Sequence, residues 1–283
     1  MPEEADKLTS TLTLALESRH NSYPVNAGNA PEPFRQILGV KFFNGSIDEA
    51  VDVMCRRGGL LVVPAAPALV NIQYDEKYRK ALLEADLAIA DSGSMVLLWK
   101  ILRGETIARI SGLSYLKRLL GDSRLRNVDL LFVVPTESAR EKAISYMQLE
   151  GFRLRADNFY VAPRYGEEVE DAPLAAMVNT RRPAHVIIGL GGGVQEKLGA
   201  YLREHGKYRP AIHCIGAALG FLTGDQTPIP DWADQLYVGW LLRLGRNPQL
   251  YLRRFWVAHK LPGLIFRYRE NVPPLVSKRK RTQ

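Results

Sequence analysis

The stretch His185–Leu198, HVIIGLGGGVQEKL, decides the fold. Its first residues, HVII, predict a buried strand, the glycines that follow predict a tight turn, and VQEKL predicts the start of a helix. An apolar strand that passes through a glycine turn into a helix is typical of α/β proteins, whose parallel strands are buried on both faces.

Outward from this unit, strands and helices alternate in both directions. Further strands are predicted in ILGVKFF, LLVVPAA, DLAIA, VDLLFVV and AIHCIGA, with helices between them. This spacing implies right-handed crossovers and a mostly parallel sheet. The fold class is therefore α/β: a Rossmann-like, mostly parallel sheet with helices on both faces, plus a C-terminal helical appendage rich in basic and aromatic residues.

Three segments differ in composition. Residues 1–35 are rich in turn formers and predict an irregular N-terminal extension. Residues 36–224 carry the alternation and predict the α/β core. Residues 225–283 contain no strand-like run but hold three of the four tryptophans, and they predict two short helices broken at Asn247–Pro248.

The formal net charge of +8 predicts an anionic partner: a phosphate-bearing substrate, a nucleic acid or an acidic membrane surface. Between Arg243 and Arg281, Glu270 is the one acid among many arginines and lysines. Bulky apolar residues beside these cations favour a membrane-docking helix. A nucleic-acid surface, or a helix that packs on the core, remains an alternative.

Several classes of site are absent from the sequence. Cys55 and Cys214 form no CxxC pair, and the histidines lack metal-binding spacing. There is no P-loop and no G-x-S-x-G motif. The N-terminus, MPEEADK, is acidic where a signal peptide is basic, and no apolar run reaches the ~18 residues that span a bilayer. We therefore expect a protein of the reducing cytosol without a metal site.

The stretch EADLAIADSGSMVLLWK places Asp91 between a predicted strand and a predicted helix. Ligands of open α/β sheets bind beyond the carboxyl ends of the strands, so Asp91 is a candidate general base or hydroxyl-binding group. Asp is also a favoured helix N-cap, and that alternative stays open. Gly93 lets the backbone approach a ligand closely, while Ser92 or Ser94 can cap the next helix.

The glycine turn after HVII departs from G-x-G-x-x-G, because its glycines have a period of two. A nucleotide diphosphate site and a plain strand-to-helix turn both fit this pattern. Gln195 and Glu196 suit either contacts to a nucleotide sugar or a solvated helix start. Arg109, before a Ser-Gly turn, suits either phosphate binding or a surface ion pair.

Four stretches occur in a fixed order: EADLAIADSGSMVLLWK, RISGLSYLKRLL, IIGLGGGVQEKL and the closing region from IHCIGAALGFL to YLRRFW. In this order they resemble the motifs of the WecG/TagA/CpsF family of glycosyltransferases (glycosyltransferase family 26). The resemblance runs from about Leu38 to Arg254. Its most specific parts are the Gln-Glu pair and the Trp-Leu-x-Arg-Leu string of the closing region.

The resemblance implies an inverting glycosyltransferase that moves a sugar from a UDP-sugar to a polyprenyl-diphosphate-linked saccharide in cell-surface polysaccharide synthesis. The products of such enzymes are exopolysaccharide, capsule or teichoic acid. It implies no metal or other cofactor and no nucleic-acid partner. It also implies a peripheral position on the cytoplasmic face of the membrane, where the tail docks on anionic lipid, and it leaves homo-oligomers open.

The resemblance further implies roles for individual residues. Asp91 matches the catalytic base. The positions that match acceptor contacts are Ser92, Gly93, Arg109, Ser111 and Gly112. The positions that match donor contacts are Gly189, Gly191, Gln195, Glu196 and Gly216. The tail arginines that match diphosphate or membrane contacts are Arg243, Arg253 and Arg254.

The chain departs from the family where many members carry a Thr-x-Asn motif. It reads VVPAAPAL there, so Pro64, Ala65 and Ala66 offer no hydroxyl or amide side chain. This departure sustains a second hypothesis, in which a non-catalytic relative binds nucleotide sugars or acts as a scaffold in a polysaccharide assembly complex. A third hypothesis, a nucleotide-cofactor oxidoreductase, is disfavoured by the broken glycine fingerprint.

Overall fold

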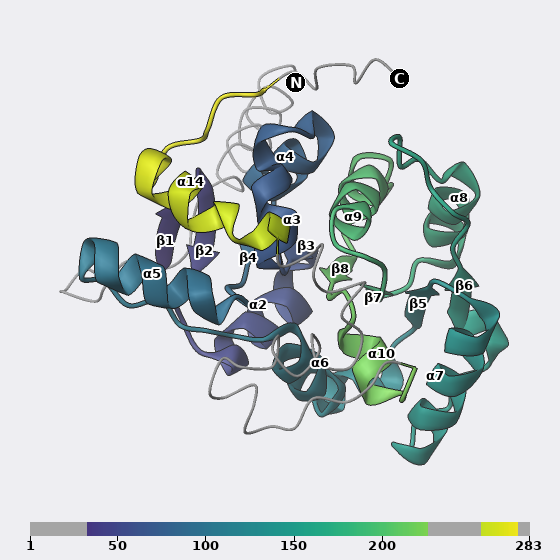
Figure 1. The fold of residues 1–283 in the computed structure, drawn as a ribbon. Helices are drawn as coiled ribbons and strands as arrows, with labels where there is room; N and C mark the ends of the chain where they lie inside the picture. The colour runs from purple at the N-terminus through teal and green to yellow at the C-terminus, as the bar shows by residue number, and fades with distance from the viewer. Residues whose placement is uncertain (1–32, 226–255, 277–283) are drawn as a thin grey trace, which may run out of the picture. The chain divides into compact units, whose positions relative to one another are not determined.

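The computed structural model describes residues 33–225 and 256–276. Within these ranges the chain forms an eight-stranded sheet in the order β1-β2-β4-β3-β8-β7-β5-β6 (Figure 1). The strands are β1 (Phe34–Ile37), β2 (Val40–Phe43), β3 (Gly59–Val62), β4 (Leu87–Ala88), β5 (Leu130–Val134), β6 (Phe159–Val161), β7 (His185–Ile188) and β8 (Ala211–Cys214). In this sheet β1 is antiparallel to β2 and every other pair is parallel. The predicted mostly parallel α/β sheet is confirmed.

The first edge of the sheet differs from the sequence prediction. ILGVKFF predicts one strand, but the chain reverses at Leu38 and Gly39 and forms a hairpin in which Ile37 pairs with Val40. Leu38 and Gly39 have φ values of 52° and 83°, the two positive values that a two-residue type I′ turn requires. Leu38 is fully buried although it lies in the turn. A buried turn residue keeps the apolar run continuous, so the pattern conceals the reversal.

Helices cover both faces of the sheet, as predicted. The helices of one face are α3 (Ala66–Leu69), η2 (Val70–Gln73), α4 (Glu76–Leu83), α5 (Gly93–Arg103), α8 (Ala172–Arg181), α9 (Val194–Glu204) and α14 (Lys260–Tyr268). Those of the other are α2 (Ile47–Arg57), α6 (Gly112–Leu120), η3 (Ser123–Asn127), α7 (Glu137–Leu149) and α10 (Ala218–Leu222), and η4 (Ala156–Asn158) leads into β6. Along β5, Leu131 and Val133 join the first hydrophobic cluster while Phe132 joins the second. This two-sided burial explains the continuous apolar strands.

Polar residues fix where several helices begin. Ser46 caps α2 in a capping box with Glu49. The hydroxyls of Ser92 and Ser111 accept backbone amides in the first turns of α5 and α6. Each cap satisfies a backbone N–H that the helix itself leaves unpaired.

The described part of the C-terminal segment packs on the core. Leu261, Leu264 and Ile265 of α14 are buried in the same hydrophobic cluster as Met95 and Trp99 of α5. The chain that follows α14 lies against the hairpin turn, because the carbonyl oxygens of residues 269 and 270 accept the amides of residues 38 and 39 at 2.8 Å. Figure 1 shows α14 beside α5. The predicted break at Asn247–Pro248 lies outside the described residues, and the domain boundaries stay a prediction.

In residues 33–225 and 256–276, no helix has the length and apolar character that crossing a bilayer requires.

A chain of hydrogen-bonded polar side chains is buried at two central strands of the sheet, β7 and β8. The Tyr115 hydroxyl lies 3.0 Å from Nδ1 of His213, and Nε2 of His213 lies 3.0 Å from Nδ1 of His185. All three side chains are buried. Burial, with help from the charge of Arg124, lowers the pKa of His185 from 6.5 to about 4, and burial lowers the pKa of His213 well below its ordinary value. A neutral His213 donates through one ring nitrogen and accepts through the other, so this chain is satisfied without charge.

Acidification is expected to destabilise the fold through these histidines. The pKa of His185 is depressed in the folded state, so its contribution is present above pH 6.5 and is lost as the pH falls towards about 4. His185→Gln keeps an acceptor for His213 but does not titrate. The free energy of unfolding in urea should be measured at about pH 7 and about pH 5. Its decrease towards the lower pH should be about 1–2 kcal/mol larger for the wild type than for the variant. Equal losses in both proteins would contradict this account of the histidine pair.

Candidate active site

The predicted site residues gather where parallel strands end. The carboxyl end of β4 leads to Asp91, that of β7 leads to the turn 189–193, and that of β8 leads to Gly216. Parallel strands bring these ends to one edge of the sheet, which is where open α/β sheets bind ligands. The candidate site therefore draws on segments more than 100 residues apart.

Asp91 does not cap α5. The cap is Ser92, so the alternative interpretation of Asp91 as the cap of this helix is wrong. Instead, Oδ1 of the Asp91 carboxylate accepts the backbone amide of Gly112 at 3.2 Å. Gly112 is the first residue of α6, and the positive end of a helix dipole stabilises a carboxylate placed there. The half-buried carboxylate is thus held at a helix N-terminus on the edge of the sheet.

The predicted acceptor residues lie together around Asp91. Nε of Arg109 donates to the backbone oxygen of Asp91 at 3.0 Å, and Ala90 pairs with Arg109 in an isolated parallel bridge. Ser111 then caps α6 beside Gly112. Because α5 and α6 both begin at this point, the first turn of each helix borders the same carboxylate. The predicted roles of these residues stay predictions.

The glycine turn after β7 is shaped by one unusual backbone angle. Gly193 has a φ of 92°, a value that residues other than glycine rarely adopt. It immediately precedes α9. Its amide donates to Oε2 of Glu196 at 2.6 Å. The carbonyl oxygen of Gly191 accepts the amides of residues 194 and 195. The turn is therefore closed by hydrogen bonds of its own backbone and of Glu196.

Gln195 and Glu196 do not form a solvated helix start. Their exposed fractions are 2% and 0%, which rules out that alternative. Oε1 of Gln195 accepts the backbone amide of Gly216 at 2.6 Å, and its amide nitrogen donates to Oε1 of Glu196 at 3.1 Å. The thiol of Cys214 donates to the backbone oxygen of Gln195. The start of α9 is thereby tied to the end of β8.

Close packing joins the donor and acceptor sets. A Cβ atom added at Gly112 would lie 3.2 Å from the carbonyl oxygen of Ile215, the residue before Gly216. A Cβ atom added at Gly192 would lie 3.3 Å from the Cβ atom of Ala68 in α3. These contacts bring α6, the end of β8, the glycine turn and the loop after β3 into one neighbourhood. The resemblance of the sequence to the family divided these residues into donor and acceptor contacts, but the sequence did not show that the two sets lie against each other.

The loop after β3 brings no polar side chain to this neighbourhood. Ala65 occupies the N-cap position of α3 and makes no side-chain hydrogen bond. The first residues of the helix are Ala66 and Pro67. The departure from Thr-x-Asn therefore falls next to the glycine turn.

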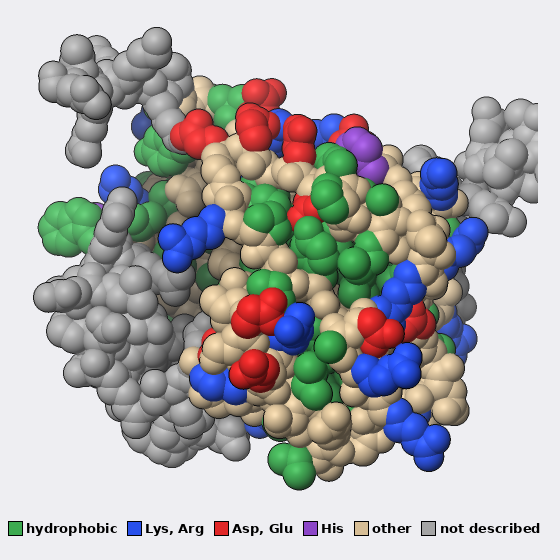
Figure 2. All heavy atoms as spheres, turned by 90° about the vertical axis from the view of Figure 1, so that its right-hand side faces the viewer, with side chains coloured by type: hydrophobic (Ala, Val, Ile, Leu, Met, Phe, Trp, Pro, Cys, Tyr) green, Lys and Arg blue, Asp and Glu red, His purple; other side chains and the backbone are tan. Residues whose placement is uncertain are grey.

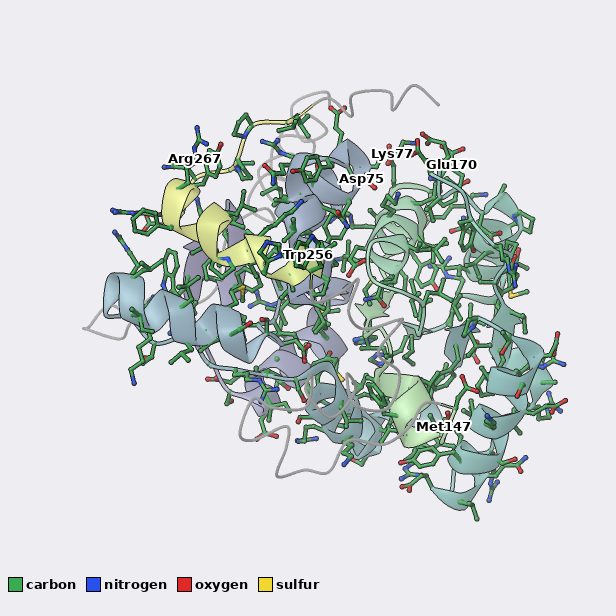
Figure 3. All side chains as sticks on the ribbon, in the orientation of Figure 1. Asp75, Lys77, Met147, Glu170, Trp256 and Arg267 are labelled. Carbon is green, nitrogen blue, oxygen red and sulfur yellow. The ribbon has the colours of Figure 1, made fainter. Side chains whose placement is uncertain are left out.

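Lys197 is a buried contact that the sequence analysis missed. Its ammonium lies 2.8 Å from Oδ2 of Asp75 and 2.9 Å from the backbone oxygen of Glu167. Asp75 also caps α4, so the pair joins α4 to α9. Figure 3 labels Asp75 in the turn that leads into α4. Only the position of Lys197 beside Gln195 and Glu196 gave a signal, because its partner is 122 residues away.

The predicted independence of metal and the predicted role of the tail arginines do not depend on the contacts described above. In the described part of the chain, no group of three or more His, Cys, Asp or Glu residues is placed to hold a metal ion. Independence of metal and of other cofactors nevertheless stays a prediction. Arg243, Arg253 and Arg254 lie outside the described residues.

A separate cavity of about 770 Å³ lies at the opposite edge of the sheet. It opens where β5 and β6 begin, and its lining includes Arg126, Phe152 and Arg181. The Arg181 guanidinium pairs with Asp129, and Arg126 covers the ring of Phe152 at 4.1 Å. None of the predicted site residues lines this cavity.

A carboxylate, an arginine and a glycine-rich turn at the carboxyl ends of parallel strands define an α/β enzyme with a site suited to phosphate-bearing substrates. Residues 35–274 match the Glycosyl transferase WecG/TagA/CpsF family, and the chain belongs to this family. It is a transferase, and membership makes it a glycosyltransferase of cell-surface polysaccharide synthesis, with a sugar donor and an acceptor as substrates. No curated protein sequence matches the chain.

The ionisation of Glu196 is expected to affect stability. Burial raises its pKa from 4.5 to about 7, against hydrogen bonds from Gln195 and Gly193. Because folding raises this pKa, the protonated carboxyl contributes to the stability of the fold. This contribution is complete below pH 4.5 and is lost as the pH rises through about 7. The free energy of unfolding, measured with a chemical denaturant, should decrease by about 1 kcal/mol between about pH 6 and about pH 8.

Glu196→Gln should remove this pH dependence, whereas Glu204→Gln, at an exposed position of the same helix, should keep it. If the stability of Glu196→Gln falls as much as that of the wild type, the carboxyl of Glu196 does not titrate as described.

Proposed function

We propose that the protein is an inverting glycosyltransferase. It transfers a sugar from a UDP-sugar to a polyprenyl-diphosphate-linked saccharide at the cytoplasmic face of the membrane. The observation that carries this proposal is the carboxylate of Asp91, held 3.2 Å from the Gly112 amide at the sheet edge where the two helices begin. Membership of the family supports the same class of reaction.

Asp91 serves as the general base. Inversion requires the acceptor hydroxyl to attack the anomeric carbon from the face opposite the leaving group, and a carboxylate must remove its proton as the bond forms. The hydrogen bond from Gly112 fixes the side chain and occupies Oδ1. The hydroxyls of Ser92 and Ser111 flank the acceptor, and Arg109 binds it. All of these groups come from one corner of the sheet.

The turn 189–193 holds the diphosphate of the donor. Backbone amides at a helix N-terminus attract phosphate oxygens, and α9 begins at this turn. Gln195 and Glu196 shape the turn from beneath, since both are buried and hydrogen-bonded to it or to Gly216. Arg243, Arg253 and Arg254 neutralise the leaving diphosphate in place of a metal ion and draw the enzyme to anionic lipid.

Replacing Asp91 is expected to abolish most turnover. Asp91→Asn keeps an oxygen that accepts the Gly112 amide, so the fold is retained while the base is lost. Transfer from a panel of UDP-sugars to a lipid-diphosphate monosaccharide should fall roughly 10²–10⁴-fold. Asp157→Asn, an exposed position at the opposite edge of the sheet, is the matched control and should transfer normally. Equal activity of Asp91→Asn and the wild type would remove Asp91 from the role of base.

The tail arginines are best tested by substitution. A deletion after Leu244 would also remove α14, whose buried leucines and isoleucine belong to the core. Arg253→Gln with Arg254→Gln should lower kcat for the lipid-linked acceptor and should weaken binding to anionic vesicles, an effect that added salt diminishes. Unchanged kcat and unchanged vesicle binding would exclude both roles.

A non-catalytic relative is the second candidate function. It is favoured by the apolar loop after β3, where Ala65 and Ala66 lead into α3, the helix whose Ala68 lies beside the glycine turn. Calorimetry that detects UDP binding, together with no transfer to any acceptor, would identify this case.

A further inference from the structure

Large apolar side chains are exposed on two neighbouring helices. On α5, the exposed fractions of Leu97 and Ile101 are 56% and 72%, and the two residues are four positions apart, on one side of the helix. Phe266 of α14 is 64% exposed, and Trp256, which precedes α14, is 72% exposed. Figure 3 shows Trp256 and Arg267 towards opposite ends of this C-terminal helical segment. We call these four apolar residues the α5–α14 face.

The two helices are fixed relative to each other. The opposite sides of both contribute to one hydrophobic cluster, through Met95 and Trp99 of α5 and Ile265 of α14. A hydrogen-bonded ion pair of 2.6 Å between Arg103 and Glu270 joins the end of α5 to the chain after α14. Because both helices pack on the same side of the sheet, both turn their exposed sides outward. The face is therefore a property of the folded body.

The charges on these segments have one sign. Residues 93–103 and 256–269 contain no acidic residue. The basic residues of these segments are Lys100, Arg103, Lys260, Arg267 and Arg269. Since Arg103 is paired with Glu270, the other four supply the free positive charge of the face. The acids Glu105 and Glu270 follow the two segments, and they pair with Arg35 and Arg103. Helices that carry apolar side chains and only positive charges are complementary to a bilayer with anionic headgroups.

Another side of the molecule has a different distribution of charge. Figure 2 shows the side of the molecule that carries α7 and α8, where acidic and basic side chains are interspersed. Leu149 at the end of α7 is 87% exposed, so a large exposed apolar residue also occurs there. It belongs to a helix that packs on the other face of the sheet. The next residue is the acid Glu150, whose backbone oxygen accepts from Arg126, so Leu149 provides an internal control for exposure beside charges of both signs.

We infer that the α5–α14 face binds the anionic surface of a lipid bilayer, and that α5 is a membrane contact in addition to the C-terminal tail. This inference rests on the proposed function, because it names the surface that meets the membrane. Gly93, the first residue of α5, follows Asp91 by two positions. The exposed Leu97 and Ile101 follow Asp91 by six and ten positions, so a bilayer that contacts α5 meets the helix that starts at the candidate base, from which side a lipid-linked acceptor would arrive.

The test measures binding of the full-length protein to vesicles. Vesicles of phosphatidylcholine that contain phosphatidylglycerol are sedimented with the wild type, with Leu97→Ser/Ile101→Ser and with Leu149→Ser. The double variant should partition roughly tenfold less, because two apolar side chains no longer enter the interface. Leu149→Ser should partition like the wild type. Circular dichroism and thermal unfolding check that each variant is folded.

The charge contribution is tested with Lys100→Gln/Lys260→Gln. Binding should weaken several-fold on the anionic vesicles and should not change on vesicles of phosphatidylcholine alone. The control is Lys207→Gln, at an exposed lysine in the loop after α9. This variant should bind both kinds of vesicle as the wild type does. Equal losses for the control and the paired variant would show that only net charge matters and would overturn the assignment of the face.

Further outcomes would overturn the inference. One is undiminished vesicle binding by folded Leu97→Ser/Ile101→Ser. Another is a change of the same variant from dimer to monomer in light scattering with vesicle binding intact, since the face would then join two copies of the chain. A water-soluble acceptor analogue separates this inference from the proposed function: the double variant should use it as the wild type does. Absence of transfer by the wild type would refute the proposed function, while the vesicle result would stand.

Discussion

The hydrogen bond from the Gly216 amide to Oε1 of Gln195 joins the two turns on which the candidate site depends. A parallel sheet leaves turn amides at the carboxyl edge, and a buried amide without an acceptor destabilises the fold. Here a side chain at the start of one helix supplies that acceptor for the turn after a neighbouring strand. Asp91 acts in the same way for Gly112. At the carboxyl ends of the strands, side-chain oxygens thus accept hydrogen bonds from the backbone amides of neighbouring turns.

This construction limits how the Gln-Glu pair takes part in binding. Oε1 of Gln195 accepts the Gly216 amide, and Glu196 accepts from Gly193 and from Gln195. Since these atoms are engaged and buried, contacts to a donor would come from the backbone of the turn that they shape. We therefore expect the pair to position the amides of the turn. Asp91 differs, because its carboxylate is half-buried and accepts a backbone amide at the N-terminus of α6.

The strands and most helices could be predicted from the sequence, because apolar runs and capping residues act locally. Ser92, one of the two capping candidates, caps its helix as expected. The hairpin at Leu38 could not be predicted, since its turn residue is buried and the apolar pattern has no break. At the site, the types of residue were visible but their partners were not. Asp91 and Gly112 are 21 residues apart, and Gln195 and Gly216 are also 21 apart, so only the packing of the sheet brings each pair together.

The same reasoning explains why α5 was not predicted as a surface helix. GSMVLLWKILR is mostly apolar, with Lys100 and Arg103 near its end, and a helix of this composition is expected to be largely buried. In the structure α14 covers part of it, yet Leu97 and Ile101 remain exposed. An exposed apolar side of this kind is typical of an interaction surface. Leu97 and Ile101 follow Asp91 by six and ten positions, on the helix that begins two residues after it. If this side meets the bilayer as we infer, attachment to the membrane and positioning of the acceptor would both depend on α5.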